Sequence, residues 1–460
     1  MKINKLMKKK FSLSGMRDFT SSEMRKREYL LSILKSHFKN YAFLPISTPI
    51  MEKRNNLFGN YNKEGEKLIF QVLKSGDYWS SVKNEITDID TSLLSSKISN
   101  KALRYDLTIP FARFVSENKS KISFPFRKYQ IGPVFRADRP QKGRLREFIQ
   151  CDVDVIGSQS LWSEIDLFYL IDSVFRSLNV NNVKIKLNHR KILEGLFESF
   201  SLNISFDDFC IIIDKIDKIG IEKTMDILIE KGCNNEDISI LNSLFSSNVS
   251  FEIKKEKILN LISNNNIISG LDDISFILEH LKLHPVYHLI EFDLSLARGL
   301  DYYTGSIFEV TSSDYNNGSL LGGGRYDQLT EKFDFKNISG VGMSFGFDRI
   351  YDLMDSQLLF PTSINDDVDF MFINFGSEES VVCQDYILKL RSLSYSAQLY
   401  PDKNKLNKQM NYANNIGVKY VIMIGEEEIA INKMKVKNMI TGIQQVITFD
   451  DFLSNLSNDE

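Results

Sequence analysis

Apolar side chains recur at helical period near the N-terminus, at Leu30, Leu31, Leu34 and Phe38. Ahead of them, residues 20–23 (TSSE) have capping-box spacing, in which a hydroxyl and a carboxylate each bind a backbone N–H at the start of a helix. The pattern predicts a helix from this box to about Asn40. Prolines follow, and because proline disfavours helix in the residue before it, residues 45–52 are expected to be extended.

Short apolar segments between residues 103 and 157 read as strands, including residues 129–136 and 148–156. Polar loops separate them, whereas regular crossover helices would be expected between parallel strands. This arrangement favours an antiparallel sheet over a doubly wound one. The apolar periodicity of residues 161–178 predicts a helix packed on that sheet.

The middle of the chain changes character. Residues 195–285 are expected to be mostly helical and to form an inserted domain, since they carry no glycine-rich loop and no dense arginine cluster. Strand-like segments return over residues 287–310, and a helix is expected from about Phe347. Residues 75–101 are rich in Ser, Lys, Asp and Asn, which favours a surface insertion without a fixed fold.

Strand and helix patterns alternate after a polar linker at residues 361–367. Strands are expected at residues 368–374, 397–400 and 418–424, and helices at residues 377–393 and 403–416. Gly417 stands where a glycine commonly ends a helix. The alternation is typical of a small α/β domain with parallel strands.

These patterns predict an α+β chain in four parts. They are a basic tail (1–14), a mixed core (15–190 and 287–358), the helical insertion (195–285) and a C-terminal α/β domain (366–460).

Composition narrows the class of protein. The net charge of 460 residues is −3, so no overall basic field attracts nucleic acid, and any RNA contact must come from local patches. No run of about 18 apolar residues suggests a membrane span, and the basic start lacks the apolar run of a secretory signal. The four cysteines lack zinc-finger spacing and fit a reducing compartment. We therefore expect a cytoplasmic protein with no metal held by a protein motif.

The densest chemistry lies in residues 132–148, where five basic residues flank the turn-forming Pro140 and Gly143. A strand, a cationic loop and a returning strand would form an anion site, and arginine suits it because its planar fork can hold two phosphate oxygens. An isolated basic loop is more often a solvated surface hairpin. The apolar frame on both sides favours the anion site here.

This segment resembles motif 2 of the class II aminoacyl-tRNA synthetases, in its histidine-specific version. Residues 298–305 (RGLDYYTG) resemble the histidine signature of that family, residues 321–327 its glycine-rich segment, and residues 340–349 its motif 3. Residues 15–19 and 48–50 resemble the family's opening and its motif 1. The resemblance covers nearly the whole chain, and the motifs stand in the family's order, which argues against agreement by chance.

The resemblance implies a class II antiparallel core, a helical insertion and an anticodon-binding C-terminal domain. It implies an enzyme that activates L-histidine with ATP, aided by Mg²⁺, and transfers it to histidine tRNA, and it implies a homodimer. Arg136 resembles the arginine that grips the ATP α-phosphate and the amino-acid carboxylate. Arg298 resembles the arginine that stabilises the charge developing on the phosphoryl oxygens, and Arg349 the one that lies against the nucleotide.

The resemblance also implies a histidine pocket. Its positions are Asp106, Thr108, Arg136, Gln150, Asp154, Arg298, Tyr302 and Tyr303. Among these, Asp154 and Tyr303 match positions that read the two imidazole nitrogens. A pocket that pairs both nitrogens rejects apolar isosteres, because its own polar groups would be left unpaired. Asp152 and Asp154 also fit plain alternation on a half-exposed strand.

For RNA, Arg139 and Gln141 match residues that meet the extra 5′ guanosine of histidine tRNAs. The C-terminal domain offers a set of lysines, which are equally typical of a solvated face: Lys403, Lys405, Lys408, Lys419, Lys433, Lys435 and Lys437. Tyr400 and Tyr412 could stack on bases, but core packing is the stronger expectation for each.

Two other functions stay open. One is a non-catalytic, synthetase-like regulatory module that binds histidine, such as the regulatory paralogue of ATP phosphoribosyltransferase. Such a module typically lacks the C-terminal domain and loses the arginine motifs, whereas this chain has both. The other is an ATP-dependent ligase for a different amino acid, against which residues 298–305 speak.

Overall fold

The computed structural model describes residues 11–59, 63–80, 82–83, 91–141, 143–200, 202–245, 249–297, 302–365 and 368–456. The chain forms two compact units. The larger comprises Met1–Phe19 and Leu30–Leu359, and the smaller comprises Thr20–Tyr29 and Phe360–Glu460. Among the described helices, none is both long and apolar enough to cross a membrane.

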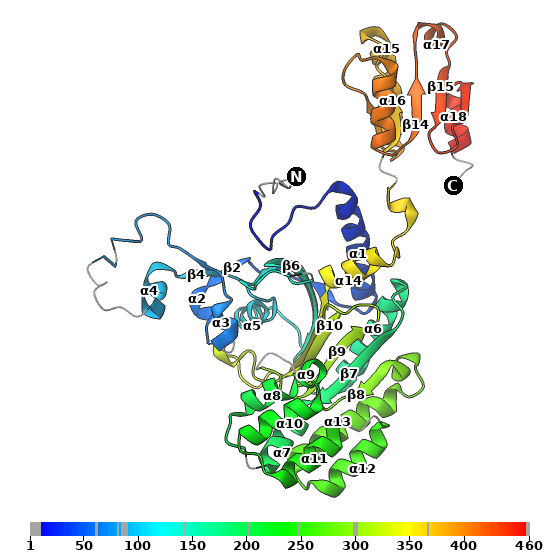
Figure 1. Cartoon of the computed structure of the whole chain (residues 1–460). Coiled ribbons are helices and arrows are strands. Elements are labelled where there is room, and N and C mark those ends of the chain that lie inside the picture. The colour runs from blue at the N-terminus through cyan, green and yellow to red at the C-terminus, as the bar shows by residue number, and fades with distance from the viewer. Residues whose placement is uncertain are drawn as a thin grey trace, which may run out of the picture. The chain divides into compact units, whose positions relative to one another are not determined.

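An eight-stranded sheet lies at the centre of the larger unit (Figure 1), in the order β1-β5-β6-β11-β10-β9-β7-β8. The end pairs β1–β5 and β7–β8 are parallel and the pairs between them are antiparallel. The predicted antiparallel sheet is therefore confirmed. The strands are β1 (Leu44–Pro45), β5 (Phe126–Phe135), β6 (Glu147–Ile156), β7 (Val183–His189), β8 (Ile290–Phe292), β9 (Ser306–Ser312), β10 (Leu321–Tyr326) and β11 (Gly340–Gly346).

Alternation along β6 gives the sheet two different faces. Cys151, Val153 and Val155 are buried on the face covered by helices α1 (Ser21–Asn40) and α6 (Trp162–Ser177). On that face the ring centroid of Phe345 lies 5.7 Å from that of Phe38 in α1 and 6.3 Å from that of Phe175 in α6. The other face of β6 carries polar side chains, because successive residues of a strand point to opposite sides.

Both covering helices match their predictions. The capping box at the start of α1 is formed, since Thr20 N donates to Glu23 Oε2 at 2.8 Å. Helix α14 (Phe347–Ser356) begins where a helix was expected and follows β11 directly.

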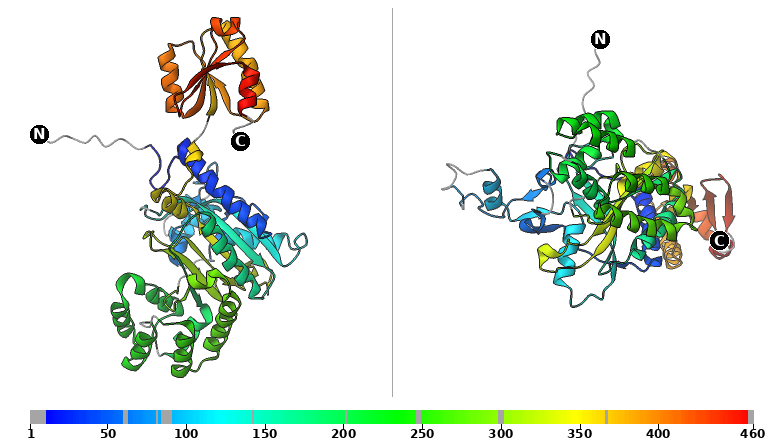
Figure 2. Two further views of the ribbon diagram at one scale, coloured as in Figure 1. Left: turned by 90° about the vertical axis from the view of Figure 1, so that its right-hand side faces the viewer. Right: turned by 90° about the horizontal axis from the view of Figure 1, so that it is seen from below.

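The helical insertion gathers beside β7 and β8 (Figures 1 and 2). It begins at Arg190, five residues before the predicted 195, because the His189 side chain caps the helix by accepting a hydrogen bond from Lys191 N. The predicted helical character of residues 195–285 is confirmed. The helices are α7 (Arg190–Ser199), α8 (Phe206–Ile213), α9 (Ile216–Ile219), α10 (Ile221–Glu230), α11 (Asn235–Phe245), α12 (Phe251–Leu261) and α13 (Asn265–Leu281).

The segment at residues 287–310 is only partly strand. A 3₁₀ helix, η2 (Pro285–Leu289), occupies its start, because Pro285 fixes a helical φ and the His284 side chain accepts a hydrogen bond from Val286 N. Strands β8 and β9 follow, with residues 298–301 between them lying outside the described part of the chain.

In the part of residues 51–117 that the structure describes, a three-stranded sheet and four helices lie beside the main sheet. The expectation that residues 75–101 lack a fixed fold is wrong for their end, where α4 forms and β4 begins; residues 81 and 84–90 lie outside the described residues. The elements are β2 (Met51–Lys53), α2 (Arg54–Leu57), α3 (Lys63–Lys67), β3 (Gln71–Val72), α4 (Thr91–Ile98), β4 (Lys101–Leu103) and α5 (Thr108–Glu117).

The C-terminal unit has a five-stranded mixed sheet in the order β13-β12-β14-β15-β16. The prediction of parallel strands is confirmed for β12–β13 and β12–β14 but wrong for β15 and β16, which are antiparallel. They form a hairpin because Asn438 Oδ1 accepts the N–H groups of Ile440 and Thr441, and Gly442 takes a φ of +75°.

The elements of this unit are η4 (Thr362–Asn365), β12 (Val368–Phe372), α15 (Ser377–Ser392), β13 (Ala397–Leu399), α16 (Leu406–Asn415), β14 (Val418–Met423), α17 (Glu426–Ala430), β15 (Met434–Asn438), β16 (Gln444–Ile447) and α18 (Phe449–Leu456). Separate hydrophobic clusters form its core.

Candidate active site

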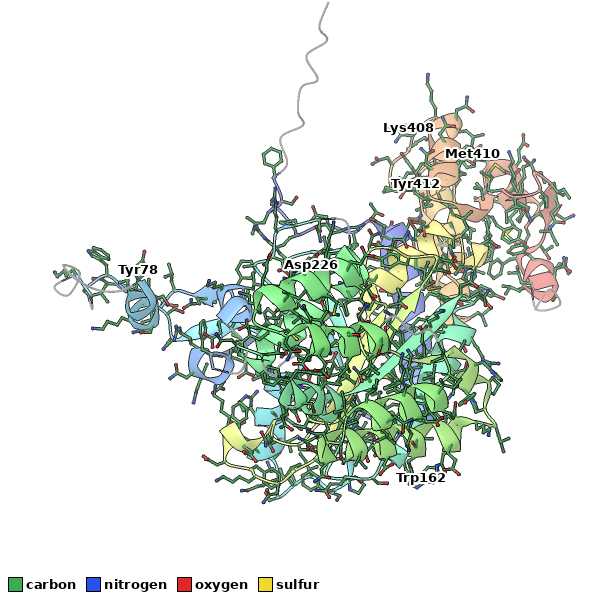
Figure 3. The ribbon with its side chains drawn as sticks, turned by 60° about the horizontal axis from the view of Figure 1, so that its bottom comes forward. Tyr78, Trp162, Asp226, Lys408, Met410 and Tyr412 are labelled. Carbon is green, nitrogen blue, oxygen red and sulfur yellow. The ribbon has the colours of Figure 1, made fainter. Side chains whose placement is uncertain are left out.

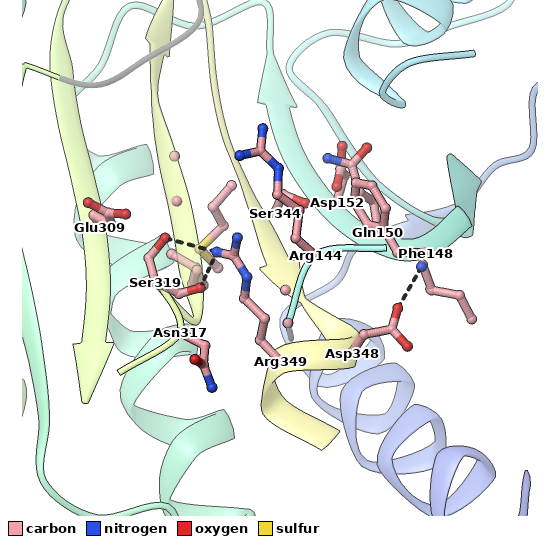
Figure 4. Close-up of a pocket in the computed structure, with 18 of the residues that line it drawn as sticks. Arg144, Phe148, Gln150, Asp152, Glu309, Asn317, Ser319, Ser344, Asp348 and Arg349 are labelled. Carbon is pink, nitrogen blue, oxygen red and sulfur yellow. Dashed lines mark hydrogen bonds between the residues drawn. The ribbon is translucent and has the colours of Figure 1, made fainter. Parts of the chain in front are cut away.

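A cavity of about 1050 Å³ lies over the polar face of the main sheet. Segments far apart in the sequence line it: the N-terminal segment, the β5–β6 hairpin, strands β9 to β11 and the start of α14. Figure 4 shows Glu309 of β9 on one side of this cavity and Gln150 and Asp152 of β6 on the other, with Arg349 between them. Such a hollow can hold ligands the size of a nucleotide and an amino acid.

Strand pairing arranges the floor of the cavity in rows, because directly paired residues share a face of the sheet. One row runs across five strands through Gln130, Asp152, Ser344, Gly322 and Glu309. The next row runs through Lys128, Asp154, Gly342 and Gly324.

Two glycines, Gly342 and Gly322, leave the sheet surface under the cavity without side chains, for different reasons. A Cβ on Gly342 would lie 1.9 Å from Asp154 Oδ1, so only glycine leaves room for that carboxylate. A Cβ on Gly322 would meet nothing within 4 Å. The open part of the cavity therefore lies above Gly322, between Asp152 and Glu309.

Arg136 stands in an aromatic frame at the end of β5. Its guanidinium carbon lies 4.2 Å from the Tyr105 ring centroid and 5.2 Å from that of Phe148, and its Nε donates to Tyr105 O at 3.1 Å. In the described part of the chain no hydrogen bond to its two terminal nitrogens is seen. They are thus oriented, and able to form a fork for an anionic oxygen pair.

Arg349 lies across the cavity on the first turn of α14. Its Nη1 donates to Ser319 O at 2.8 Å, which holds the side chain along the wall (Figure 4). The neighbouring Asp348 accepts a hydrogen bond from Ile149 N at 2.9 Å, which joins α14 to β6. Arg349 at the start of α14 and Arg136 at the end of β5 thus both line the cavity.

The β5–β6 hairpin closes another side. Gln141 and Arg144 exchange two backbone hydrogen bonds, and Gly143 takes a φ of +74°, which a side chain rarely tolerates. Arg144 Nη2 pairs with Asp138 Oδ1 at 2.7 Å. Gln141 lines the cavity, whereas Arg139 is exposed and does not.

Asp154 forms a buried ion pair with Lys128, whose side chain is fully buried and whose Nζ lies 4.3 Å from the Phe111 ring centroid. Tyr326 donates its hydroxyl to the other carboxylate oxygen, Asp154 Oδ1, at 2.8 Å. Burial, reinforced by the Asp154 charge, raises the pKa of Tyr326 well above its ordinary value, so it stays a donor.

Tyr302 and Tyr303 approach the cavity from the segment before β9. Tyr302 donates to Thr108 Oγ1 at 3.3 Å, and the two tyrosine rings pack edge to face. Burial raises the pKa of Tyr303, and the charges of Asp154 and Asp152 raise it further, so this hydroxyl also remains protonated.

The turn into α5 is tied to β6 by Gln150. Gln150 Oε1 accepts from Leu107 N at 3.2 Å, and Asp106 Oδ1 accepts from Ile109 N at 3.2 Å. Thr108 and Gln150 line the cavity, while Asp106 is buried behind its lining.

Most predicted positions come together in this one cavity. Those that line it are Thr108, Arg136, Gln141, Gln150, Asp154, Tyr302, Tyr303 and Arg349. Arg298 lies outside the described residues, Asp106 lies just behind the lining, and Arg139 is on the surface.

Sequence reasoning missed several residues of the lining: Arg17, Asp152, Lys218, Glu309 and Ser344. Asp152 had a signal, since it alternates with two predicted residues on one strand. Arg17 lies in the segment 15–19 that resembles the family's opening, but that resemblance gave it no role in a site. Lys218 had no signal, because only the fold brings the insertion to the cavity. Arg17 follows a segment fixed by Arg146, whose N–H donates to Gly15 O at 2.8 Å.

The cavity does not form a metal site by itself. Among the residues that the structure describes, no three His, Cys, Asp or Glu side chains are grouped so as to hold a metal ion. A magnesium ion here would be bound chiefly through phosphate oxygens and water.

The C-terminal lysines are divided between internal pairs and solvent. Lys419 pairs with Asp369 at 3.1 Å and Lys435 with Glu428 at 3.2 Å. Tyr400 is buried and packs edge to face on the partly exposed Tyr412 of α16, which Figure 3 shows with Lys408. The expectation of core packing is confirmed for Tyr400 and wrong for Tyr412, whose side chain is 39% exposed.

Comparison with known proteins gives consistent results. A family model described as histidyl-tRNA synthetase matches residues 95–350, and one described as an anticodon binding domain matches residues 369–459. The histidine–tRNA ligase of Christiangramia forsetii is 42% identical over 440 residues, with 95% of this chain and 96% of the relative covered. That of Phocaeicola vulgatus is 43% identical over 442 residues, with 96% and 97% covered.

Solved structures agree on the fold. The crystal structure of histidyl-tRNA synthetase from Nostoc sp. PCC 7120 matches with a TM-score of 0.78 at 26% identity, with 98% of this chain and 100% of that chain covered. A protein described as an ATP phosphoribosyltransferase regulatory subunit/histidyl-tRNA synthetase from Bacillus halodurans shares the fold, with a TM-score of 0.70 at 18% identity.

Proposed function

The chain belongs to the histidyl-tRNA synthetase family, and from that premise we propose how its cavity activates histidine and charges histidine tRNA. The carboxylate of histidine attacks the α-phosphorus of ATP, and pyrophosphate leaves. The 3′-hydroxyl of the tRNA's terminal adenosine then attacks the activated carbonyl, and AMP leaves. No protein nucleophile is required, so the side chains bind, orient and stabilise charge.

Arg136, Arg298 and Arg349 would hold the ATP. Arg136 presents two oriented nitrogens to the α-phosphate and the histidine carboxylate, because its aromatic frame fixes the guanidinium plane. Arg349, which also lines the cavity and is held by Ser319 O, would lie against the nucleotide. We assign to Arg298 the charge that develops at the α-phosphate, on the strength of the histidine signature around it. Magnesium, carried by ATP, would neutralise phosphate charge.

The histidine would lie along β6. Asp106, Thr108 and Gln150 surround the turn into α5, where polar oxygens suit the α-ammonium group. Tyr302 holds Thr108 in place through its hydroxyl. The imidazole would extend toward Asp154 and Tyr303, one end of a floor lined by carboxylates.

For tRNA, we assign Arg139 and Gln141 of the hairpin to the acceptor end, since one is exposed and the other lines the cavity. The C-terminal unit would bind the anticodon. We also propose a homodimer, formed as class II cores pair through motif 1. None of the four cysteines, all of them among the described residues, forms a disulfide, which fits the reducing cytoplasm.

The observation that carries this function is the meeting of Arg136, Arg349 and the polar face of β6 around one cavity. A regulatory module would have no need of oriented cations there. Exchange of labelled pyrophosphate into ATP, measured with each of the twenty amino acids, should occur with histidine alone. Absence of exchange in folded protein, with histidine still bound, would favour the regulatory module.

A further inference from the structure

We propose that Asp152 is a specificity residue that accepts the ring N–H of the substrate histidine. The proposal rests on the proposed function, because it concerns the same cavity. It gives the imidazole an acceptor that the family resemblance does not assign.

The first step concerns Asp154, the carboxylate expected to read the ring. Its Oδ2 is paired with the buried ammonium of Lys128, and its Oδ1 accepts the Tyr326 hydroxyl. Each oxygen therefore already has a partner before any substrate binds. Asp154 therefore holds Lys128 and Tyr326 in place, and a ligand N–H that it accepted would share an oxygen with one of them.

Asp152 is in the opposite situation. It lines the cavity and is 4% exposed, yet its Oδ1 has no hydrogen-bond partner within the described part of the chain. Gln130, its directly paired neighbour on β5, donates its amide N–H to Thr48 Oγ1 at 2.9 Å. A buried polar oxygen without a partner is costly in a folded protein. A ligand that donates an N–H would remove that cost.

Position along β6 identifies which part of the substrate this is. Gln150 is tied to the turn into α5, where the α-ammonium is proposed to lie. Asp152 stands one row farther from that turn, flanked by Ser344 of β11. Its charge and that of Asp154 both raise the pKa of Tyr303, so Asp152 is near the tyrosine at the imidazole end.

The charged surroundings suit an imidazole. Lys128 of β5, Asp154 of β6, Asp106 before α5 and Arg104 after β4 act on Asp152, and Ser344 bonds to it. Burial raises the pKa of Asp152 to about 7, against the counteracting charge of Lys128. This is close to the ordinary pKa of imidazole, about 6.5, so the carboxylate and the ring can share a proton with little cost.

The test uses two substrates in pyrophosphate exchange: histidine, and β-(2-thiazolyl)alanine, whose ring has an acceptor nitrogen but no N–H. In Asp152→Ala, which removes the acceptor oxygens, the KM for histidine should rise roughly 10- to 100-fold, the loss of one charged hydrogen bond. The KM for the thiazole analogue should change much less. The ratio of the KM for the thiazole analogue to the KM for histidine should therefore fall by a similar factor.

Asp172→Ala is the matched control, since Asp172 is a buried carboxylate on α6, paired with Arg176 and absent from the cavity lining. It should leave both KM values unchanged. Asp152→Val, which also lacks an acceptor, replaces Asp152→Ala if the alanine variant does not fold.

Two outcomes overturn the proposal. Equal losses on both substrates would assign Asp152 to the α-ammonium, and unchanged values would remove it from binding. In either case histidine-dependent exchange by the unchanged protein would leave the proposed function standing. Failure of that exchange would instead overturn the proposed function.

Discussion

At the scale of single residues, the site is built from charges taken out of water. Lys128 is completely buried, and the free-energy cost of removing its ammonium group from water is offset by the Asp154 carboxylate and the Phe111 ring. For Asp152, the Lys128 charge and a hydrogen bond with Ser344 oppose the effect of burial only in part, so burial raises its pKa to about 7. The buried Oδ1 of Asp152, which lacks a partner among the described residues, is available to a ligand, and it also lowers the stability of the ligand-free protein.

The pH dependence of stability follows from that pKa. The unfolded chain releases the Asp152 proton near pH 4, whereas the folded chain keeps it until about pH 7. Between about pH 4 and pH 7 the folded state therefore binds more protons than the unfolded state. The contribution of Asp152 to the free energy of unfolding falls as the pH rises through this range and is constant above it. As the pH rises from 5 to 8, the free energy of unfolding of Asp152→Asn should therefore increase by about 2–3 kcal/mol relative to that of the unchanged protein.

Urea unfolding of the ligand-free protein, followed by tryptophan fluorescence, measures this difference. Both tryptophans, Trp79 and Trp162, belong to the larger unit, so the signal reports on it alone. A difference between the two proteins that does not vary with pH would contradict the raised pKa.

At the scale of elements, β10 shows how one strand serves two faces. Gly322 faces the open cavity, while a Cβ on its neighbour Gly323 would lie 2.5 Å from Gly342 O and 2.7 Å from Phe308 Cε2. Farther along, Arg325 Nη2 forms a buried ion pair with Glu164 Oε2 at 2.5 Å, which joins β10 to α6. The strand is thus fixed to the helices that cover one face of the sheet, and at Gly322 it presents no side chain to the cavity on the other face.

The two adjacent glycines should respond oppositely to substitution. Gly322→Val adds its side chain to open space, so the unfolding midpoint should change little, while histidine-dependent exchange should fall by about tenfold or more because substrate volume is lost. Gly323→Ala overpacks the sheet and should lower stability by about 1–3 kcal/mol. Measuring exchange and urea unfolding on both variants checks this, and a Gly322→Val enzyme with full activity would show that substrate lies elsewhere.

At the scale of the molecule, the activation cavity is lined entirely by the larger unit, among the residues described. The smaller unit has its own hydrophobic clusters. Within the smaller unit, the first half of α1 is joined to the segment Thr362–Asn365 by a hydrogen bond that Arg25 Nε donates to Ile364 O at 2.9 Å. Activation and recognition of the distal tRNA are therefore separable by a cut placed after that segment.

Deleting residues 366–460 should change pyrophosphate exchange little. Charging of tRNA at low tRNA concentration should fall by about 100-fold or more, because a second binding site on the same ligand is lost. Charging assays at limiting and saturating tRNA, run beside exchange, make the comparison. Equal losses in both reactions would contradict the assignment of the smaller unit to tRNA binding.

The sequence alone determined the order of elements, the antiparallel sheet and the helical insertion, and its family motifs predicted eight of the residues that line the cavity. It could do so because hydrophobic period and local motifs, such as the capping box before α1 and the arginines of the hairpin, act within short stretches of chain. Only the tertiary structure decided which carboxylate is already paired, since Lys128, Asp154 and Tyr326 meet across three strands. It also brought Arg17 and Lys218 to the cavity, because contacts between distant segments depend on packing that no local pattern records.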